Sequence, residues 1–110
     1  MAMLRPGLSY VKREWATFNV NGQPRRVACH DTDLTEADKV FAALAAGNVE
    51  FVGDGVRERN FSFAEPSEIS VTPERVFISF RTGDRSCSIF VKGKLIGEKF
   101  QITYSGMVCA

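Results

Sequence analysis

Apolar and polar residues alternate over two stretches near the start of the chain, on either side of Asn21-Gly22. The first stretch, residues 14–20, predicts a strand in which Trp15 lies on the face opposite the apolar set Ala16, Phe18 and Val20. Asn-Gly is a preferred pair for a two-residue hairpin turn, because both central positions of that turn need positive φ. The pattern therefore predicts a β-hairpin whose second strand covers residues 23–30.

The predicted turn determines which residues face each other across the hairpin. It sets three cross-strand pairs: Trp15 with Ala28, Ala16 with Val27, and Asn19 with Pro24. The last pair is a non-hydrogen-bonded one, so the missing N–H of Pro24 costs little, provided that its strand lies on a sheet edge.

One stretch shows helical rather than strand periodicity. Its apolar residues recur at intervals of three and four and form a single stripe: Ala37, Val40, Phe41, Leu44 and Ala45. Thr35 with Asp38 resembles a capping box, and Asp33 is a competing N-cap. Gly47-Asn48 supplies a left-handed stop. We therefore predict one amphipathic helix over about residues 34–47.

The remainder of the chain predicts short strands separated by turn residues. The strands would cover residues 49–52, 56–63, 68–71, 76–80, 87–91 and 100–104, with turns at residues 53–55, 72–75, 82–85 and 92–94. The predicted fold class is α+β: a β-hairpin, one helix, then an antiparallel meander that forms a bent sheet packed on the helix. This order resembles that of ubiquitin-like β-grasp folds and other small α+β rolls, and too many folds share it to indicate a family.

Length and composition indicate one ordinary globular domain. The chain has 110 residues, of which 45% are hydrophobic and 25% charged, and this balance excludes a disordered or low-complexity chain. We expect a single domain over residues 1–110, with residues 1–9 loosely ordered. No run approaches the roughly 20 apolar residues of a spanning helix, and the first residues lack the apolar core of a secretory signal. The sequence therefore predicts a cytoplasmic protein without a membrane partner.

Three cysteines, Cys29, Cys87 and Cys109, form no CxxC pair. An odd number of cysteines in a chain without a secretory signal predicts reduced thiols. We expect Cys29 and Cys87 to be small apolar core residues on strands, and Cys109 to be exposed.

Catalytic and metal-binding motifs are weak in this sequence. Cys29, His30 and Asp31 are adjacent, but consecutive strand residues point to opposite faces, so the thiol and the imidazole should diverge. A metal site built on His30, Asp31 and Asp33 would lack a second histidine, because the chain has only one. Gly53-x-Gly55 is followed by a predicted strand rather than a phosphate-binding helix. We therefore expect no metal, no cofactor and no enzymatic activity; a small enzyme using Cys29 or His30 is the least favoured alternative.

Charge is distributed in three consecutive blocks, although the net charge is only +1. Residues 1–30 are basic, residues 31–68 are acidic, and residues 75–104 are basic again. If the first and last strands adjoin, a basic face would oppose an acidic helix side and could steer a charged partner. The candidate basic contact residues are Arg25, Arg26, Arg81, Arg85, Lys92 and Lys94. The acidic alternative consists of Asp31, Asp33, Glu36 and Asp38.

These observations predict a small non-enzymatic binding module that acts through protein–protein contact. Inhibitors, immunity proteins and anti-defence proteins of phages or mobile elements have this profile. The alternative is a β-sheet module that binds RNA or single-stranded DNA, because Arg59 precedes two same-face rings, Phe61 and Phe63. The segment lacks the full aromatic and glycine pattern of such modules. Exposed strand edges also leave homodimerisation open.

Overall fold

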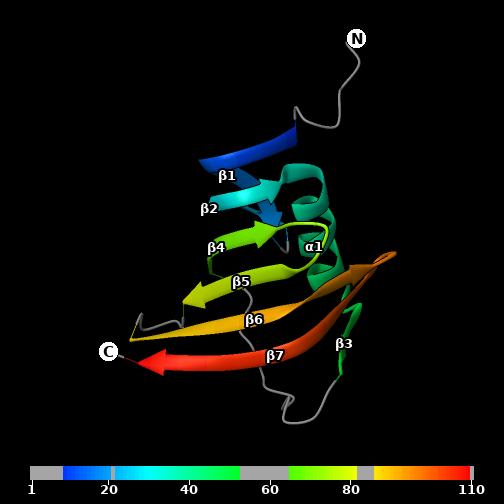
Figure 1. Ribbon diagram of the computed structural model, residues 1–110. Helices are drawn as coiled ribbons and strands as arrows, with labels where there is room; N and C mark the ends of the chain where they lie inside the picture. The colour runs from blue at the N-terminus through cyan, green and yellow to red at the C-terminus, as the bar shows by residue number, and fades with distance from the viewer. Residues whose placement is uncertain (1–8, 21, 53–64, 82–85, 110) are drawn as a thin grey trace.

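The structure is a computed structural model that describes residues 9–20, 22–52, 65–81 and 86–109. These residues form one seven-stranded sheet in the order β1-β2-β4-β5-β6-β7-β3, with one helix against it (Figure 1). The elements are β1 (Tyr10–Val20), β2 (Gln23–Asp33), α1 (Leu34–Ala46), β3 (Val49–Phe51), β4 (Pro66–Val71), β5 (Val76–Arg81), β6 (Cys87–Ile96) and β7 (Lys99–Cys109).

The predicted α+β class is confirmed, but the antiparallel meander is wrong in two places. β2 pairs in parallel with β4, and β3 pairs in parallel with β7, so the sheet is mixed. Parallel neighbours require a crossover connection. For β2 and β4 this connection is the chain between them, which contains α1. β1 and β7 are not adjacent, so the first and last strands do not form the joint basic face that the sequence suggested. The strand predicted over residues 56–63 and the turns predicted at 53–55 and 82–85 lie outside the described residues.

The β1–β2 hairpin has the predicted register. The observed pairs include Trp15 with Ala28, Ala16 with Val27, and Asn19 with Pro24. Gly22 has a φ of 86°, and its N–H donates to Asn19 Oδ1 over 2.9 Å. However, β1 is the edge strand and β2 lies inside the sheet. Pro24 is still tolerated because β4 pairs with β2 only at Ala28 and Cys29, so its missing N–H removes no ladder bond among the described residues.

Helix α1 begins and ends close to the predicted bounds, but its N-cap is Asp33. The Asp33 carboxylate accepts from the N–H of Thr35 over 2.9 Å and of Glu36 over 3.2 Å. The predicted capping box of Thr35 and Asp38 is therefore not the cap. Gly47, with a φ of 72°, ends the helix in the left-handed conformation.

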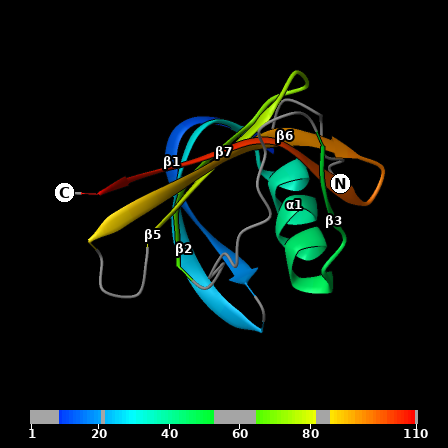
Figure 2. The ribbon, with the colours of Figure 1, turned by 90° about the horizontal axis from the view of Figure 1, so that it is seen from below.

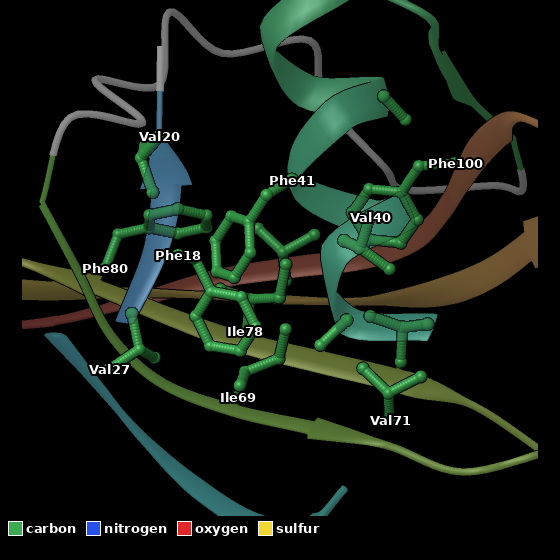
Figure 3. Packing of buried hydrophobic residues seen from close by; sticks show 14 of the residues in the cluster. Phe18, Val20, Val27, Val40, Phe41, Ile69, Val71, Ile78, Phe80 and Phe100 are labelled. Carbon is green, nitrogen blue, oxygen red and sulfur yellow. The ribbon is translucent and has the colours of Figure 1, made fainter. Parts of the chain in front are cut away.

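The core lies between α1 and the concave side of the curved sheet (Figure 2). Phe41 of α1 and Phe18 of β1 have ring centroids 4.9 Å apart. Around them pack inward-facing residues of the inner strands (Figure 3), including Val27, Ile69, Ile78 and Phe80. The helix therefore covers one face of the sheet, and the opposite face, called the outer face below, carries no helix among the described residues.

The β6–β7 hairpin differs from its prediction in the position of the turn. The predicted turn at residues 92–94 is wrong, because β6 continues to Ile96 and the turn follows at Gly97-Glu98. Gly93 instead lies at a register shift, where a Cβ atom would collide with the backbone carbonyl of Gln101. A glycine within a strand pattern here marks a close backbone approach rather than a chain reversal.

Two of the three cysteines form a disulfide that cysteine counting missed. Cys87 of β6 and Cys109 of β7 face each other in register, with Cα atoms 4.1 Å apart, and are bonded. The expectation of reduced thiols, and of Cys87 as a core residue, was therefore wrong. Cys29 is free and buried, as predicted. Within the described residues, no helix has the length and apolar character needed to cross a membrane.

Candidate functional site

The outer face presents cross-strand rows of residues, because neighbouring strands hold their side chains in register. One row runs through Trp15, Ala28, Glu68, Ser79, Phe90 and Gly106. The adjacent row contains Ser70, Phe77, Lys92 and Tyr104. Aromatic rings and cations therefore lie side by side on a surface that no helix of the described residues covers.

Two exposed rings of the outer face each lie close to a cationic side chain. The guanidinium carbon of Arg26 lies 5.3 Å from the centroid of the Trp15 ring, and Lys92 Nζ lies 5.6 Å from that of Tyr104. The two rings are 61% and 54% exposed, respectively. Such pairs present apolar area and positive charge at the same place, which suits a partner that offers both apolar and anionic groups.

A hollow of about 580 Å³ lies beside Trp15, where the described part of the sheet has a gap between β2 and β4. It is lined by Trp15, Pro24, Arg25, Arg26, Ala28, Glu65, Pro66, Ser67, Glu68 and Arg81. Among the described residues, β2 starts at Gln23, whereas β4 starts at Pro66 and first pairs with β2 at Ala28. Five residues of β2 thus precede the first residue that pairs with β4. We call this feature the arginine hollow.

The guanidinium groups of the arginine hollow are incompletely paired. Arg25 Nη2 donates to Gln23 Oε1 over 2.9 Å, but Arg25 Nε is buried and has no hydrogen-bond partner among the residues that the structure describes. Among the described residues, no carboxylate forms an ion pair with Arg25, Arg26 or Arg81. A buried donor without an acceptor is costly, and a carboxylate or phosphate oxygen would satisfy it.

Two carboxylates moderate the charge of the arginine hollow. Three arginines and two glutamates line it, which leaves a net charge of plus one. Glu68 is turned toward His30, whose Nε2 lies 3.8 Å from Glu68 Oε2. The hollow therefore suits a few well-placed anionic groups better than a dense polyanion.

The residues of the predicted basic face lie at separate places in the structure. Arg25 and Arg26 are consecutive residues of β2 and so point to opposite faces, and both reach the hollow because it lies at the edge of the strand. Arg81 completes this group, whereas Lys92 lies next to Tyr104 elsewhere on the outer face. Lys94 lines a separate hollow together with Asp33, Glu36 and Arg75. Arg85 lies outside the described residues.

Most of the predicted acidic face is occupied by contacts within the chain. Asp33 caps α1, and Asp31 Oδ1 accepts from the Tyr10 hydroxyl over 3.3 Å. Glu36 pairs with Lys39 over 2.9 Å, and this contact raises the pKa of the Lys39 ammonium. Only Asp38 has no such contact among the described residues, and it borders a shallow hollow between α1 and the hairpin. These four residues do not form one unpaired acidic surface.

Cys29 and His30 diverge, as the strand alternation predicted. The Cys29 side chain is buried in the core, where its thiol donates to the carbonyl of Val27 over 3.6 Å. Burial raises the pKa of the Cys29 thiol, and the charge of Glu14 raises it further. His30 lies on the other face beside Glu68, so these two residues do not form a nucleophile and base pair. No group of three metal-binding side chains occurs among the described residues.

Sequence patterns missed Trp15 and Tyr104 as parts of a candidate site. Trp15 gave a usable signal, because a large ring on the polar face of an amphipathic strand has no place in the core. The signal from Tyr104 was misleading, because Tyr104 continues the every-second-residue series of Phe100 and Ile102, which are buried. The register shift between β6 and β7 adds one residue to β7 and moves Tyr104 to the outer face.

Comparison of the chain with protein-family models, with curated proteins and with solved structures finds no match. The functional argument therefore depends on the described surface and its chemistry. Within that surface, the arginine hollow and the adjacent Trp15 ring combine charge, apolar area and an unsatisfied donor.

Proposed function

We propose that the protein is a small non-enzymatic binding module that acts through protein–protein contact, with the arginine hollow and the Trp15 ring as its contact surface. One observation carries this proposal: an exposed indole lies beside three guanidinium groups that no described carboxylate pairs. Tryptophan and arginine are the residue types that most often dominate the binding energy of protein interfaces. The partner surface is therefore expected to be acidic and to offer an apolar group to Trp15.

The exposed side of α1 is a weaker candidate for the contact surface. It presents mainly alanines, Ala42, Ala45 and Ala46, to the hollow beside the hairpin. A methyl side chain offers little area and no hydrogen bond to a partner. The outer face supplies larger rings and unpaired donors, so we assign the contact there.

A module of this kind acts by occupying a site on another macromolecule. Small inhibitors, immunity proteins and anti-defence proteins of phages or mobile elements work in this way, and we propose this class of role by analogy. The acidic partner surface would be one that normally binds basic segments, since the arginine hollow would compete for it.

The test is affinity capture from a native-host lysate that is divided into nuclease-treated and untreated halves. We expect the wild-type protein to retain the same protein partner from both halves. Trp15→Ala and Arg26→Glu should lose that partner, whereas Lys99→Glu, an exposed charge reversal at the far end of β7, should retain it. Retention of the partner by both outer-face variants would contradict the assignment of the contact surface.

A second candidate function is binding of RNA or single-stranded DNA. The observation that favours it is the pair of cation-capped rings on one face, Arg26 with Trp15 and Lys92 with Tyr104. Bases stack on such rings while cations meet the phosphates. The Arg59–Phe63 segment that first suggested this function lies outside the described residues. A partner set that disappears with nuclease, together with affinity that falls steeply with salt, would support it over the protein partner.

Location and oligomeric state are separate parts of the proposal. The sequence predicts the cytoplasm, whereas a Cys87–Cys109 disulfide persists mainly in oxidising compartments. Thiol trapping in intact host cells would assign the location, because only a reduced pair is consistent with a reducing cytoplasm. The exposed edge of β1 could pair with a second copy, and sedimentation analysis would detect such a dimer.

A further inference from the structure

On one edge of strand β2, residues 23–27 have no partner strand among the described residues. β1 pairs with one edge of β2 from Val20 with Gln23 to Tyr10 with Asp33, interrupted only at Asp31. β4 pairs with the other edge only at Ala28 and Cys29. Within the described residues, the first half of β2 is therefore unpaired on this side, although β2 lies between β1 and β4 in the sheet. This unpaired edge borders the arginine hollow.

The register shows which backbone groups this edge offers. Val20 and Gln23 close the two-residue turn as a hydrogen-bonded pair, and such pairs alternate along an antiparallel ladder. Pro24 and Arg26 consequently turn their peptide groups away from β1, toward the hollow. Pro24 presents a carbonyl only, and Arg26 presents both an N–H and a carbonyl. One donor and two acceptors thus lie along the open edge.

On the opposite wall of the hollow, Glu65 is hydrogen-bonded to β5. The N–H of Arg81 in β5 donates to the carbonyl of Glu65 over 2.9 Å. This bond holds Glu65, the described residue just ahead of β4, against β5. A register shift between Pro66 and Glu68 follows at once. The hollow of about 580 Å³ therefore lies beside the position that a longer β4 would have occupied.

We infer that the arginine hollow binds an extended acidic peptide segment of the partner, which adds as a strand beside residues 23–27 of β2. This inference rests on the proposed protein-binding function and specifies how the partner is held. Strand addition to an exposed edge is a common mode of peptide recognition, in which the backbone gives affinity and alternate side chains give specificity. Alternate side chains of the segment point to the outer face, beside Arg26 and Arg81. We therefore expect acidic residues at alternate positions, and a carboxylate oxygen within reach of Arg25 Nε.

The same features disfavour a nucleic acid in the hollow. A phosphodiester strand can meet the arginines, but it has no row of N–H and C=O groups to pair with Pro24 and Arg26. Glu65 and Glu68 also line the hollow and would repel a continuous polyanion, whereas isolated carboxylates can avoid them.

The test begins with a random linear peptide library selected in parallel on the wild-type protein and on Arg26→Glu. We expect the wild-type selection to enrich sequences with Asp or Glu at alternate positions, and the variant selection to lack them. Enrichment of neutral or basic sequences, the same sequences on both proteins, or no enrichment would overturn the inference. Arg26→Gln serves as a milder variant, and circular dichroism checks that each variant is folded.

The highest-affinity peptide then tests the strand geometry. Fluorescence anisotropy should show that Arg26→Glu weakens its binding by about tenfold or more, and that Lys99→Glu leaves it unchanged. N-methylation of alternate peptide bonds should abolish binding, and the Arg26 amide should become protected from hydrogen exchange in the complex. Binding that survives N-methylation at every position, or an unprotected Arg26 amide, would contradict strand addition.

Two further results separate this inference from the function on which it rests. If affinity capture yields a protein partner that depends on Trp15 while no acidic peptide is selected, strand addition fails and the binding function stands. If neither experiment yields a protein ligand and a thymidine oligonucleotide binds instead, both proposals fail in favour of nucleic-acid binding.

Discussion

Replacement of Thr32 by valine tests whether a single buried hydroxyl connects β2 to β4. Thr32 is fully buried, and its Oγ1 lies 2.9 Å from the carbonyl oxygen of His30 and 3.0 Å from that of Ile69. The same oxygen accepts from the N–H of Val71 over 3.3 Å. The side chain holds this position because Asp31, with a φ of 45°, interrupts the regular strand just before it.

The Val71 N–H depends on this hydroxyl. Thr72 donates to the carbonyl of Arg75, so the pair next to the β4–β5 turn is hydrogen-bonded and the following pair, Val71 with Val76, is not. The Val71 N–H therefore points toward β2, where it meets Thr32 Oγ1. Without the hydroxyl, a buried donor loses its acceptor.

The magnitude follows from two opposing effects of Thr32→Val. An unsatisfied buried donor costs about 1–3 kcal/mol. The added methyl group contributes about 0.8 kcal/mol of apolar burial, and valine has the same shape, so no cavity forms. We expect a net loss of about 0.5–2 kcal/mol in the free energy of unfolding. If apolar burial dominated, the variant would instead be more stable than the wild type.

Urea unfolding followed by far-ultraviolet circular dichroism measures this difference. The unfolding midpoint should fall while the slope of the free energy with urea stays constant, which indicates a change in native stability alone. Thr32→Ser keeps the hydroxyl and controls for the hydrogen bonds, and it should lose only the burial of one methyl group. A Thr32→Val protein as stable as the wild type would refute the reasoning.

Three further substitutions test other contacts of the fold. Cys109→Ser removes a disulfide with a sequence separation of 22 residues from Cys87, and chain entropy predicts a loss of about 3 kcal/mol. Thermal unfolding should show this loss without reductant and no difference from the reduced wild type with it. Gly93→Ala places a methyl group against the Gln101 carbonyl and should cost about 1–3 kcal/mol, with disturbed β6–β7 amide resonances; an unchanged spectrum would contradict the close approach. Asp33→Ala removes the N-cap of α1 and should cost about 1 kcal/mol in urea unfolding, whereas Asp33→Asn, which can still cap, should cost less.

The open edge of β2 would normally promote unwanted strand pairing. Unpaired strand edges attract other strands, and proteins protect them with proline and with charged side chains. Pro24, Arg25 and Arg26 are the kinds of residue that serve this purpose. A second copy of this edge would bring arginines against arginines, whereas an acidic strand would not meet this repulsion. The same residues can therefore prevent self-association and select the charge of the partner.

The sequence alone determined the local features of the protein. The Asn21-Gly22 turn and the alternation around it predicted the hairpin register residue by residue, and the apolar stripe with Gly47 predicted the helix almost to its ends. Alternation also predicted that Cys29 and His30 diverge. These features depend on turn chemistry and side-chain period, which act between residues close together in the chain.

Only the tertiary structure decided what depends on residues far apart in the chain. The parallel pairing of β2 with β4 depends on a crossover of about thirty residues, and it leaves the open edge beside Arg25 and Arg26. The shift in the β6–β7 register moves Tyr104 from the core side to the outer face. The Cys87–Cys109 bond arises from that same pairing. No local pattern encodes these contacts, because strand order and register result from which arrangement of the whole chain buries its apolar faces together.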